Sequence, residues 1–195
     1  QNGKLTVRLL YNVKAGIVQR KIVRHDTGKF KVPCLSVYGE ECPVCNAVSE
    51  AESNLGKECG AYRKYGYRVR GMCFAQIVAH DPVYFTDSND PVDGDIVILQ
   101  YPKTVYDLIN NIIIESVSNN VNLVSENEAL SVVIDRQQKS LKDFPKYNAY
   151  LNAFGTHKTF EDDSSATGEE KFDNLLNSLP NLSEVLVPEN PTEEV

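Results

Sequence analysis

Four residues near the start of the chain most constrain how it can fold. They are His25, Cys34, Cys42 and Cys45, and the last two belong to the run Cys-Pro-Val-Cys. Two cysteines separated by two residues can present both sulfurs to one metal ion from a tight turn. Three thiolates and one imidazole fill the tetrahedral shell of a zinc ion and leave no open position, as in structural rather than catalytic sites. The spacing therefore predicts one structural Zn(2+) ion that fixes a loop in place.

Other interpretations of the cysteines stay open. The chain has five of them, and an odd number suits a disulfide framework poorly. No segment has the character of a signal peptide or a membrane span, so we expect a reducing compartment, where Cys-x-x-Cys indicates a metal site or a redox dithiol. A second tetrad would use Cys59 in place of His25. We favour His25 because it ends an apolar run from which a rigid strand could aim the imidazole.

Charge is distributed unevenly along the chain, which has a formal net charge of −7. Residues 1–160 carry 19 basic and 17 acidic side chains, whereas residues 161–195 carry ten acidic side chains and one basic side chain, Lys171. Such asymmetry suggests a polyanion-binding body beside an acidic segment, and ordinary surface charge is the alternative.

The pattern of elements predicts a mainly β fold with a few helices. Segments rich in β-branched residues, or with alternating apolar residues, predict strands at 5–10, 16–25, 65–79, 95–101, 121–124 and 130–135, with a short ribbon at 29–31. Helical spacing or composition predicts helices at 48–55, after Pro102 and at 169–179. This number of strands with one inserted helix fits a small, partly closed antiparallel barrel of the oligonucleotide-binding (OB) type.

Cations and aromatic side chains are interleaved in residues 61–70, AYRKYGYRVR. Cations suit phosphates, and tyrosine rings suit stacked bases, each stack contributing about 1–3 kcal/mol regardless of the base. The alternative is a solvated strand whose tyrosines cap the core. The stretch therefore predicts nucleic-acid binding by Tyr62, Arg63, Lys64, Tyr65, Tyr67, Arg68 and Arg70, with Arg68 and Arg70 on one face of a strand.

Further candidates for the same surface lie elsewhere in the chain. A second basic and aromatic stretch at 136–150 contributes Arg136, Lys139, Lys142, Phe144, Lys146 and Tyr147. Arg8 lies in an opening strand, and Tyr101 and Lys103 lie at a strand-to-helix junction that could line the same groove.

Signals for an enzyme are poor. The chain has no P-loop motif and no Gly-x-Ser-x-Gly elbow, and its acidic residues gather in loops and at the end of the chain. We therefore expect no catalytic residues. The competing hypothesis is a zinc-ribbon protein–protein adaptor without nucleic-acid binding. A nuclease and an RNA-binding protein are weaker alternatives, the second because base stacking does not distinguish the sugars.

The order of these motifs resembles that of the single-stranded DNA-binding proteins of T-even-type tailed phages. The resemblance extends over most of the chain, from about Lys4 to Leu186. It includes a strand with an embedded arginine (LTVRLL), the zinc histidine, a cysteine followed by Cys-Pro-Val-Cys, and a basic-aromatic strand that ends in Asp-Pro. It continues with YPKTVYDLINN, RQQKSLKDFPKYNAYL and a closing amphipathic helix followed by Leu-Ser-Glu.

The resemblance implies an OB-fold barrel with an inserted zinc-ribbon-like subdomain. Residues 1–160 would form the single-stranded DNA-binding core, with the zinc-binding subdomain at 25–59 inserted in it. Residues 161–195 would form an acidic linker and an amphipathic helix that packs on the core. A positive cleft between barrel and subdomain would hold the strand.

The resemblance also implies a cellular role. The protein would coat single-stranded DNA in phage DNA replication, recombination and repair, in the cytoplasm of an infected bacterial host. Phage replication and recombination proteins are the expected partners, and no membrane contact is expected. The family's basic N-terminal arm is not recognisable here, which leaves self-association as an open expectation.

Overall fold

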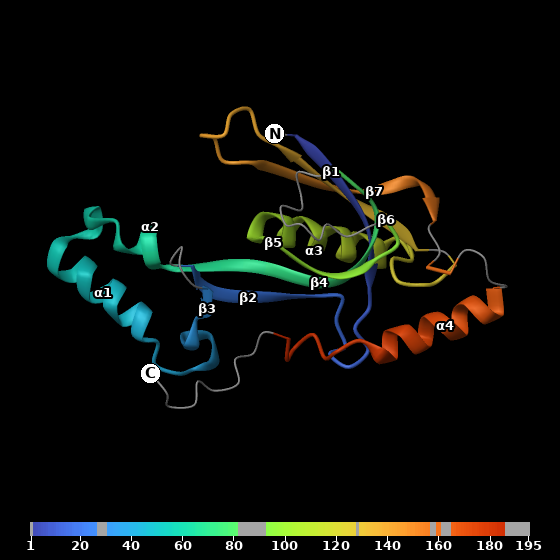
Figure 1. The fold of residues 1–195 in the computed structure, drawn as a ribbon, viewed down its shortest axis with the longest axis horizontal. Coiled ribbons are helices and arrows are strands. Elements are labelled where there is room, and N and C mark those ends of the chain that lie inside the picture. The colour runs from blue at the N-terminus through green and yellow to red at the C-terminus, as the bar shows by residue number, and fades with distance from the viewer. Residues whose placement is uncertain are drawn as a thin grey trace. The chain divides into compact units, whose positions relative to one another are not determined.

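The computed structural model describes residues 2–26, 31–81, 93–127, 129–156, 159–160 and 165–185. The protein is mainly β, with a seven-stranded antiparallel sheet and a few helices (Figure 1). The strands are β1 (Gly3–Leu10), β2 (Gln19–Asp26), β3 (Lys31–Pro33), β4 (Tyr67–His80), β5 (Ile96–Pro102), β6 (Leu130–Gln137) and β7 (Lys146–Thr156). The α-helices are α1 (Pro43–Leu55), α2 (Ala61–Tyr65), α3 (Lys103–Ser118) and α4 (Ser165–Ser178), and the 3-10 helices are η1 (Leu35–Tyr38) and η2 (Lys57–Cys59). No helix among the described residues has both the length and the apolar character needed to cross a lipid bilayer.

The chain forms two compact units. The first contains Gln1–Arg20 and Gly71–Ser183, and the second contains Lys21–Arg70, with Glu184 and Val185 assigned to it as well. The segment 25–59, expected to bind zinc, lies within the second unit, which we call the metal unit.

The strand order of the sheet is β3-β2-β4-β1-β6-β7, and β5 pairs with β4 off this path. β1 is paired on both sides, with Leu5 opposite His80 of β4 and opposite Ile134 of β6. Among the described residues no pairing joins β7 back to the other end of the order, so the sheet is not closed. The OB barrel expected from the sequence therefore stays a proposal.

Most expected strands are present, with ends shifted by a few residues. The strand expected at 121–124 is wrong, because the chain there is irregular. The Asn122 side chain accepts hydrogen bonds from the amides of Val124 and Ser125, both at 3.0 Å, and this local turn replaces a strand ladder. The helix expected at 48–55 begins earlier, at Pro43. Residues 82–92, between β4 and β5, lie outside the described residues.

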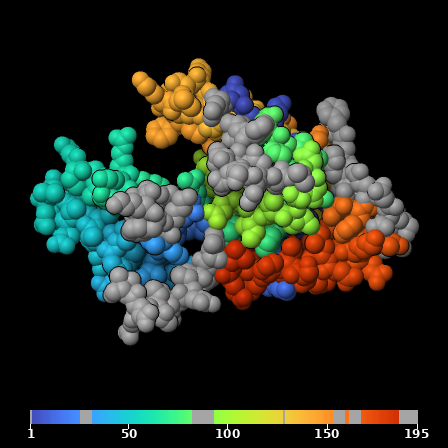
Figure 2. All heavy atoms as spheres, in the orientation of Figure 1, coloured from blue at the N-terminus to red at the C-terminus, as the bar shows by residue number. Residues whose placement is uncertain are grey.

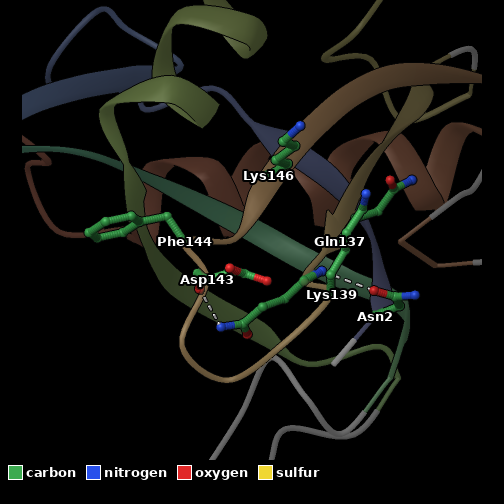
Figure 3. Close-up of a pocket in the computed structure, with 7 residues that line it drawn as sticks. Asn2, Gln137, Lys139, Asp143, Phe144 and Lys146 are labelled. Atoms are coloured by element: carbon green, nitrogen blue, oxygen red, sulfur yellow. Dashed lines mark hydrogen bonds between the residues drawn. The ribbon is translucent and has the colours of Figure 1, made fainter.

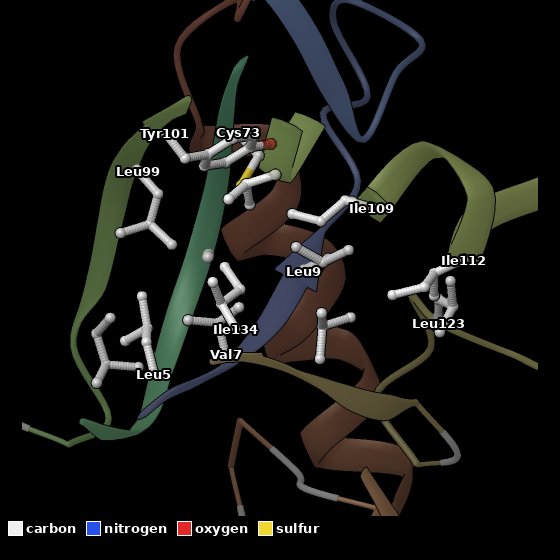
Figure 4. Packing of buried hydrophobic residues seen from close by; sticks show 14 residues of the cluster. Leu5, Val7, Leu9, Cys73, Leu99, Tyr101, Ile109, Ile112, Leu123 and Ile134 are labelled. Atoms are coloured by element: carbon white, nitrogen blue, oxygen red, sulfur yellow. The ribbon is translucent and has the colours of Figure 1, made fainter. Parts of the chain in front are cut away.

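The core of the first unit lies between the sheet and α3. Alternate residues of β1, namely Leu5, Val7 and Leu9, are buried on one face of the strand. Val105 and Ile109 of α3, four residues apart, belong to the same buried cluster, and Figure 4 shows Ile109 beside Leu9. The close-up also shows residues of β4, β5 and β6 completing the cluster. Sequence spacing within α3 predicts this face, because apolar residues recur at helical intervals.

Arg8 points into the protein. The side chain is fully buried, and its Nη1 lies 2.9 Å from Oε2 of Glu126, which is also buried. Burial lowers the pKa of Arg8 from its ordinary value, although the charge of Glu126 and the hydrogen bond to it oppose this. The guanidinium also donates to the Ser125 carbonyl and lies 4.6 Å from the ring centre of Phe172 in α4. A buried ion pair thus joins β1 to the loop that precedes β6, and the same guanidinium contacts α4 through the Phe172 ring.

Helix α4 packs its apolar side on the first unit, where Figure 2 shows it as a continuous orange-to-red band. Phe172, Leu176 and Leu179 are buried, in agreement with the amphipathic spacing. The chain after α4 is tied down by Asn12, whose Nδ2 donates to the Pro180 carbonyl at 2.8 Å and whose Oδ1 accepts from the Leu182 amide at 3.0 Å. The acidic helix is therefore part of the folded core.

Candidate metal centre and nucleic-acid interface

His25, Cys34, Cys42 and Cys45 converge within the metal unit, and their ligand atoms all lie within 4.8 Å of one another. The Nε2 atom of His25 is 3.3 Å from Sγ of Cys42 and 3.6 Å from Sγ of Cys45. The sulfurs of Cys34 and Cys45 are 3.5 Å apart. The cysteines are free thiols rather than disulfides. These four side chains could hold a metal ion and would fill its shell with four protein donors.

Local backbone structure brings the three sulfurs together. Cys34 precedes η1, and Cys42 is the N-cap of α1, where Pro43 occupies the first helical position. Proline is favoured there because its fixed φ matches a helix and because an N–H at this position would have no partner within the helix. Cys45 follows two residues later on the first turn of the same helix. Unpaired amides at a helix N-terminus favour negatively charged sulfurs, so this turn suits thiolate ligands.

The pKa values of the two helix cysteines shift in opposite directions. Burial favours the neutral thiol of Cys42, but hydrogen bonds from the backbone of Cys45 and Leu35 outweigh burial and lower its pKa to about 6. Burial raises the pKa of Cys45 to about 11. Ser36 donates a hydrogen bond to the Cys45 sulfur at 3.4 Å. The donor set therefore includes one thiolate near neutral pH.

The imidazole of His25 is oriented by a backbone acceptor. His25 is buried in β2, opposite Val32 of β3, and its Nδ1 lies 2.9 Å from the carbonyl oxygen of Tyr65 at the end of α2. A protonated Nδ1 donating to this oxygen leaves Nε2 free to face the sulfurs. Histidines that bind metals are commonly held by such a second hydrogen bond. Sequence reasoning missed this contact, because a backbone carbonyl 40 residues away leaves no signal in residue types.

Cys59 is exposed and lies outside the cluster. Its sulfur is 3.8 Å from the Ala51 carbonyl, and it is not part of the group that could share an ion. Cys73 is fully buried in the first unit, where burial raises the pKa of its thiol to about 12. Of the two tetrads left open by the sequence, the structure brings together the one that contains His25.

The residues expected to bind nucleic acid in the metal unit form a short helix followed by the start of β4. Tyr62, Tyr65 and Tyr67 are 43%, 37% and 42% exposed, and Arg63 and Lys64 between them are exposed as well. We call these five residues the basic-aromatic surface.

Contacts within the basic-aromatic surface hold the rings in place. The rings of Tyr62 and Tyr67 meet edge to face, with centroids 5.7 Å apart. The Lys64 ammonium lies 4.9 Å from the Tyr65 ring centre. Gly66 makes the close reversal between α2 and β4, because a Cβ atom there would lie 2.4 Å from the Tyr62 carbonyl oxygen.

Arg68 and Arg70 differ from the exposed cations. The Arg68 guanidinium donates to the carbonyls of Arg63, Gly66 and Tyr67, so it fastens α2 to β4. Arg70 is half-buried. Of the pair expected to present two cations on one face of a strand, Arg68 is therefore occupied in holding the backbone, and Arg70 is partly withdrawn from solvent.

The second expected stretch forms the turn between β6 and β7 in the first unit, which projects in amber at the top of Figure 2. Phe144 is 88% exposed, and Lys139, Lys142 and Lys146 are exposed around it. Gln138 braces the turn by donating to Asn2 Oδ1 at 3.0 Å and to the Asp143 carbonyl at 2.8 Å. Beside it lies a hollow of about 420 Å³ (Figure 3), lined by Asn2, Gln137, Gln138, Lys139, Asp143, Phe144 and Lys146.

Other expected nucleic-acid contacts are placed elsewhere. Arg8 is buried against Glu126, and Tyr101 is 6% exposed and donates to Gln19 Oε1 at 2.7 Å, so neither can reach a strand on the surface. They are left out of the proposed interface. Lys103 is exposed but pairs with Asp107. Arg136 is half-buried and donates to Gln138, and Tyr147 packs against the core.

Comparison of the sequence with protein-family models and with curated proteins found no match in either case.

Proposed function

We propose that the protein is a non-catalytic, sequence-nonspecific single-stranded DNA-binding protein. The observation that carries this proposal is the basic-aromatic surface, in which three exposed tyrosines and two exposed cations fall within residues 62–67. Exposed aromatic rings normally cost solubility, and their combination with cations matches the two chemical components of a single strand. The exposed Phe144 with its neighbouring lysines gives the first unit a surface of the same kind.

Binding would combine stacking with counterion release. Bases of a flexible single strand can stack on tyrosine and phenylalanine rings, whereas bases in a duplex are already stacked on one another. Each base stacked on a protein ring contributes about 1–3 kcal/mol. Each phosphate neutralised on a single strand contributes about −0.7 to the slope of log K against log salt concentration. The protein would therefore bind tightly at low salt and show little dependence on base sequence.

We propose that the ion in the cluster is Zn(2+). A tetrahedron with Zn–S bonds of about 2.3 Å and Zn–N bonds of about 2.0–2.1 Å has S–S edges of about 3.8 Å and S–N edges of about 3.6 Å. The separations of 3.5 Å between the Cys34 and Cys45 sulfurs, and of 3.3 and 3.6 Å between sulfur and His25 Nε2, are close to these edges. Thiolate-rich sites favour zinc over harder ions. When bound, the ion would cross-link β2, η1 and α1.

The metal centre and the basic-aromatic surface are linked directly. Tyr65 belongs to the surface, and its carbonyl oxygen accepts the hydrogen bond that orients His25. The ion would fix the imidazole of His25 by coordination, and the hydrogen bond from His25 to the Tyr65 carbonyl would then fix the end of α2. This contact supports a structural role for the metal in presenting the tyrosines and cations.

The broader biology follows from the sequence resemblance alone. It supports an OB-type arrangement of the strands and a role in coating single strands during phage DNA replication, recombination and repair. Under this proposal the protein acts in the cytoplasm of an infected bacterium, beside phage replication and recombination proteins.

Replacing two cations of the basic-aromatic surface tests the proposal. We expect the double variant Arg63→Ser/Lys64→Ser to bind a fluorescent oligothymidylate of about 16 nucleotides more weakly at low salt. The slope of log K against log salt concentration should become shallower by about 1.4, because two phosphate contacts are lost. Fluorescence anisotropy titrations at several salt concentrations measure both quantities.

The control removes the same charge elsewhere. Lys14 and Lys57 are exposed and lie outside the basic-aromatic surface. Lys14→Ser/Lys57→Ser should leave the slope nearly unchanged. If both double variants change it equally, this surface does not contact phosphates.

A protein–protein adaptor is the second candidate. It is favoured by exposed apolar side chains on the metal unit, because Val37, Tyr38 and Leu55 are 51%, 45% and 73% exposed. An adaptor would show no oligonucleotide binding in the same titration. An RNA-binding protein would prefer the ribose form of the oligonucleotide, so a matched oligouridylate separates that alternative.

A further inference from the structure

Strand β7 forms one end of the strand order, beside β6 (Figure 1). Within the described residues it pairs with β6 alone, so its second side is a long edge. The pairing is regular from Lys146, opposite Gln137, to Leu151, opposite Val132. An edge strand presents a row of backbone groups that can pair with another strand.

One hydrogen bond identifies the groups that face outward. The amide of Ala149 donates to the side-chain oxygen of Asn148 at 3.0 Å, in an exposed position, and this places the Ala149 amide on the side away from β6. Backbone polar groups alternate in direction along an antiparallel strand. The outward groups of the regular part are therefore those of Tyr147, Ala149 and Leu151, whereas Asn148 and Tyr150 pair with β6.

The chemistry of this edge is unusual for a strand that faces solvent. Proteins usually protect edges with charges, prolines or bulges. Residues 146–152, KYNAYLN, contain one charge, Lys146, and no proline. Tyr150 is 38% exposed on the outer face, and Asn148 beside it is also exposed. In the regular part of the strand, up to Leu151, the Asn148 side chain covers one amide, and a partner strand could replace it; the pairing with β6 becomes irregular only beyond Leu151.

We propose that β7 is a self-association edge that pairs antiparallel with β7 of a second copy of this chain. A two-fold axis at Ala149 would place Tyr147 opposite Leu151 of the second copy, and Asn148 opposite its Tyr150. Lys146 would lie opposite Asn152 of the second copy, so no like charges meet. Such a two-fold pairing uses the same patch on both chains. The outward backbone groups would form about six hydrogen bonds across the axis.

A charge design at the outer face tests the pairing. In Asn148→Lys/Tyr150→Lys, two lysines face each other twice across the axis, and we expect the dimer dissociation constant to rise about tenfold or more. In Asn148→Glu/Tyr150→Lys, each glutamate faces a lysine of the second copy, so dimerisation should persist. Sedimentation equilibrium measures both, and circular dichroism verifies that both variants are folded.

Hydrogen exchange locates the interface in the unmodified protein. Raising its concentration should slow exchange at the amides of Tyr147, Ala149 and Leu151 and leave those of Asn148 and Tyr150 unchanged, because the latter are already bonded to β6. A protein that stays monomeric up to its solubility limit would overturn the proposal. A dimer that both charge variants retain equally would also overturn it, as would slower exchange confined to another surface.

Discussion

The double variant Cys42→Ser/Cys45→Ser is expected to lose its metal ion and to unfold the metal unit while the first unit stays folded. In the described part of Lys21–Arg70, the buried hydrophobic side chains are Ile22, Cys34, Cys42 and Val48. Two of these four are metal ligands, so little apolar burial remains to stabilise about 50 residues. A structural zinc ion contributes an apparent free energy of about 10–16 kcal/mol, comparable to the whole stability of a domain.

Hydrogen exchange measures this outcome unit by unit. Amides of α1 should lose protection in the variant, and amides of β1 and β6 should keep it. A chelator added to the unmodified protein should reproduce the pattern, with metal content verified by elemental analysis. Cys59→Ser is the matched control, because this exposed cysteine lies outside the cluster, and it should retain both metal and protection. Unchanged protection of α1 in verified metal-free protein would contradict a structural role for the ion.

Replacing Glu126 by glutamine is expected to destabilise the first unit by about 3–5 kcal/mol. Removing one partner of a buried ion pair leaves an uncompensated charge, which is the costly case. Arg8 and Glu126 have side chains 0% and 1% exposed, so water cannot replace the lost partner. The Phe160 amide, which donates to Glu126 Oε1 at 2.9 Å, can still donate to the glutamine oxygen, so the main loss is the charge. Urea denaturation followed by circular dichroism measures the change.

Two comparisons separate charge from packing in this experiment. Asp107→Asn removes the exposed partner of Lys103 and should cost less than about 1 kcal/mol, because surface pairs contribute little. Arg8→Met/Glu126→Leu removes both buried charges and should be more stable than Glu126→Gln, since an apolar replacement of a buried pair is often neutral or stabilising. A cost for Glu126→Gln as small as that for Asp107→Asn would show that the pair does not hold β1 to the loop before β6.

The metal ligands could be predicted from the sequence because their signal is local. The first turn of α1 fixes the positions of Cys42 and Cys45 relative to each other. Three cysteines and a histidine at such spacing have few common roles other than binding a metal ion. The acceptor for His25 could not be predicted, since any carbonyl in the chain is chemically equivalent to that of Tyr65 until the fold selects one.

Arg8 illustrates the opposite situation. Its setting in LTVRLL, among residues that become buried on both faces of β1, is itself a signal of burial. The partner that makes this burial tolerable, Glu126, is 118 residues away. Sequence periodicity gives no information about such a pair, so residue type alone predicts an exposed cation at this position. The same reasoning applies to Arg68, whose backbone acceptors depend on the reversal at Gly66.

The most direct test of the central proposal is an equilibrium titration of the metal-loaded protein with single-stranded and double-stranded DNA of equal length. The chain has ten tyrosines and no tryptophan, so quenching of tyrosine fluorescence reports contact of bases with its rings. We predict that the single strand quenches this fluorescence and binds more tightly than the duplex, with an affinity that falls steeply as salt is added. Failure of the single strand to bind at low salt, or equal binding of strand and duplex, would contradict the account.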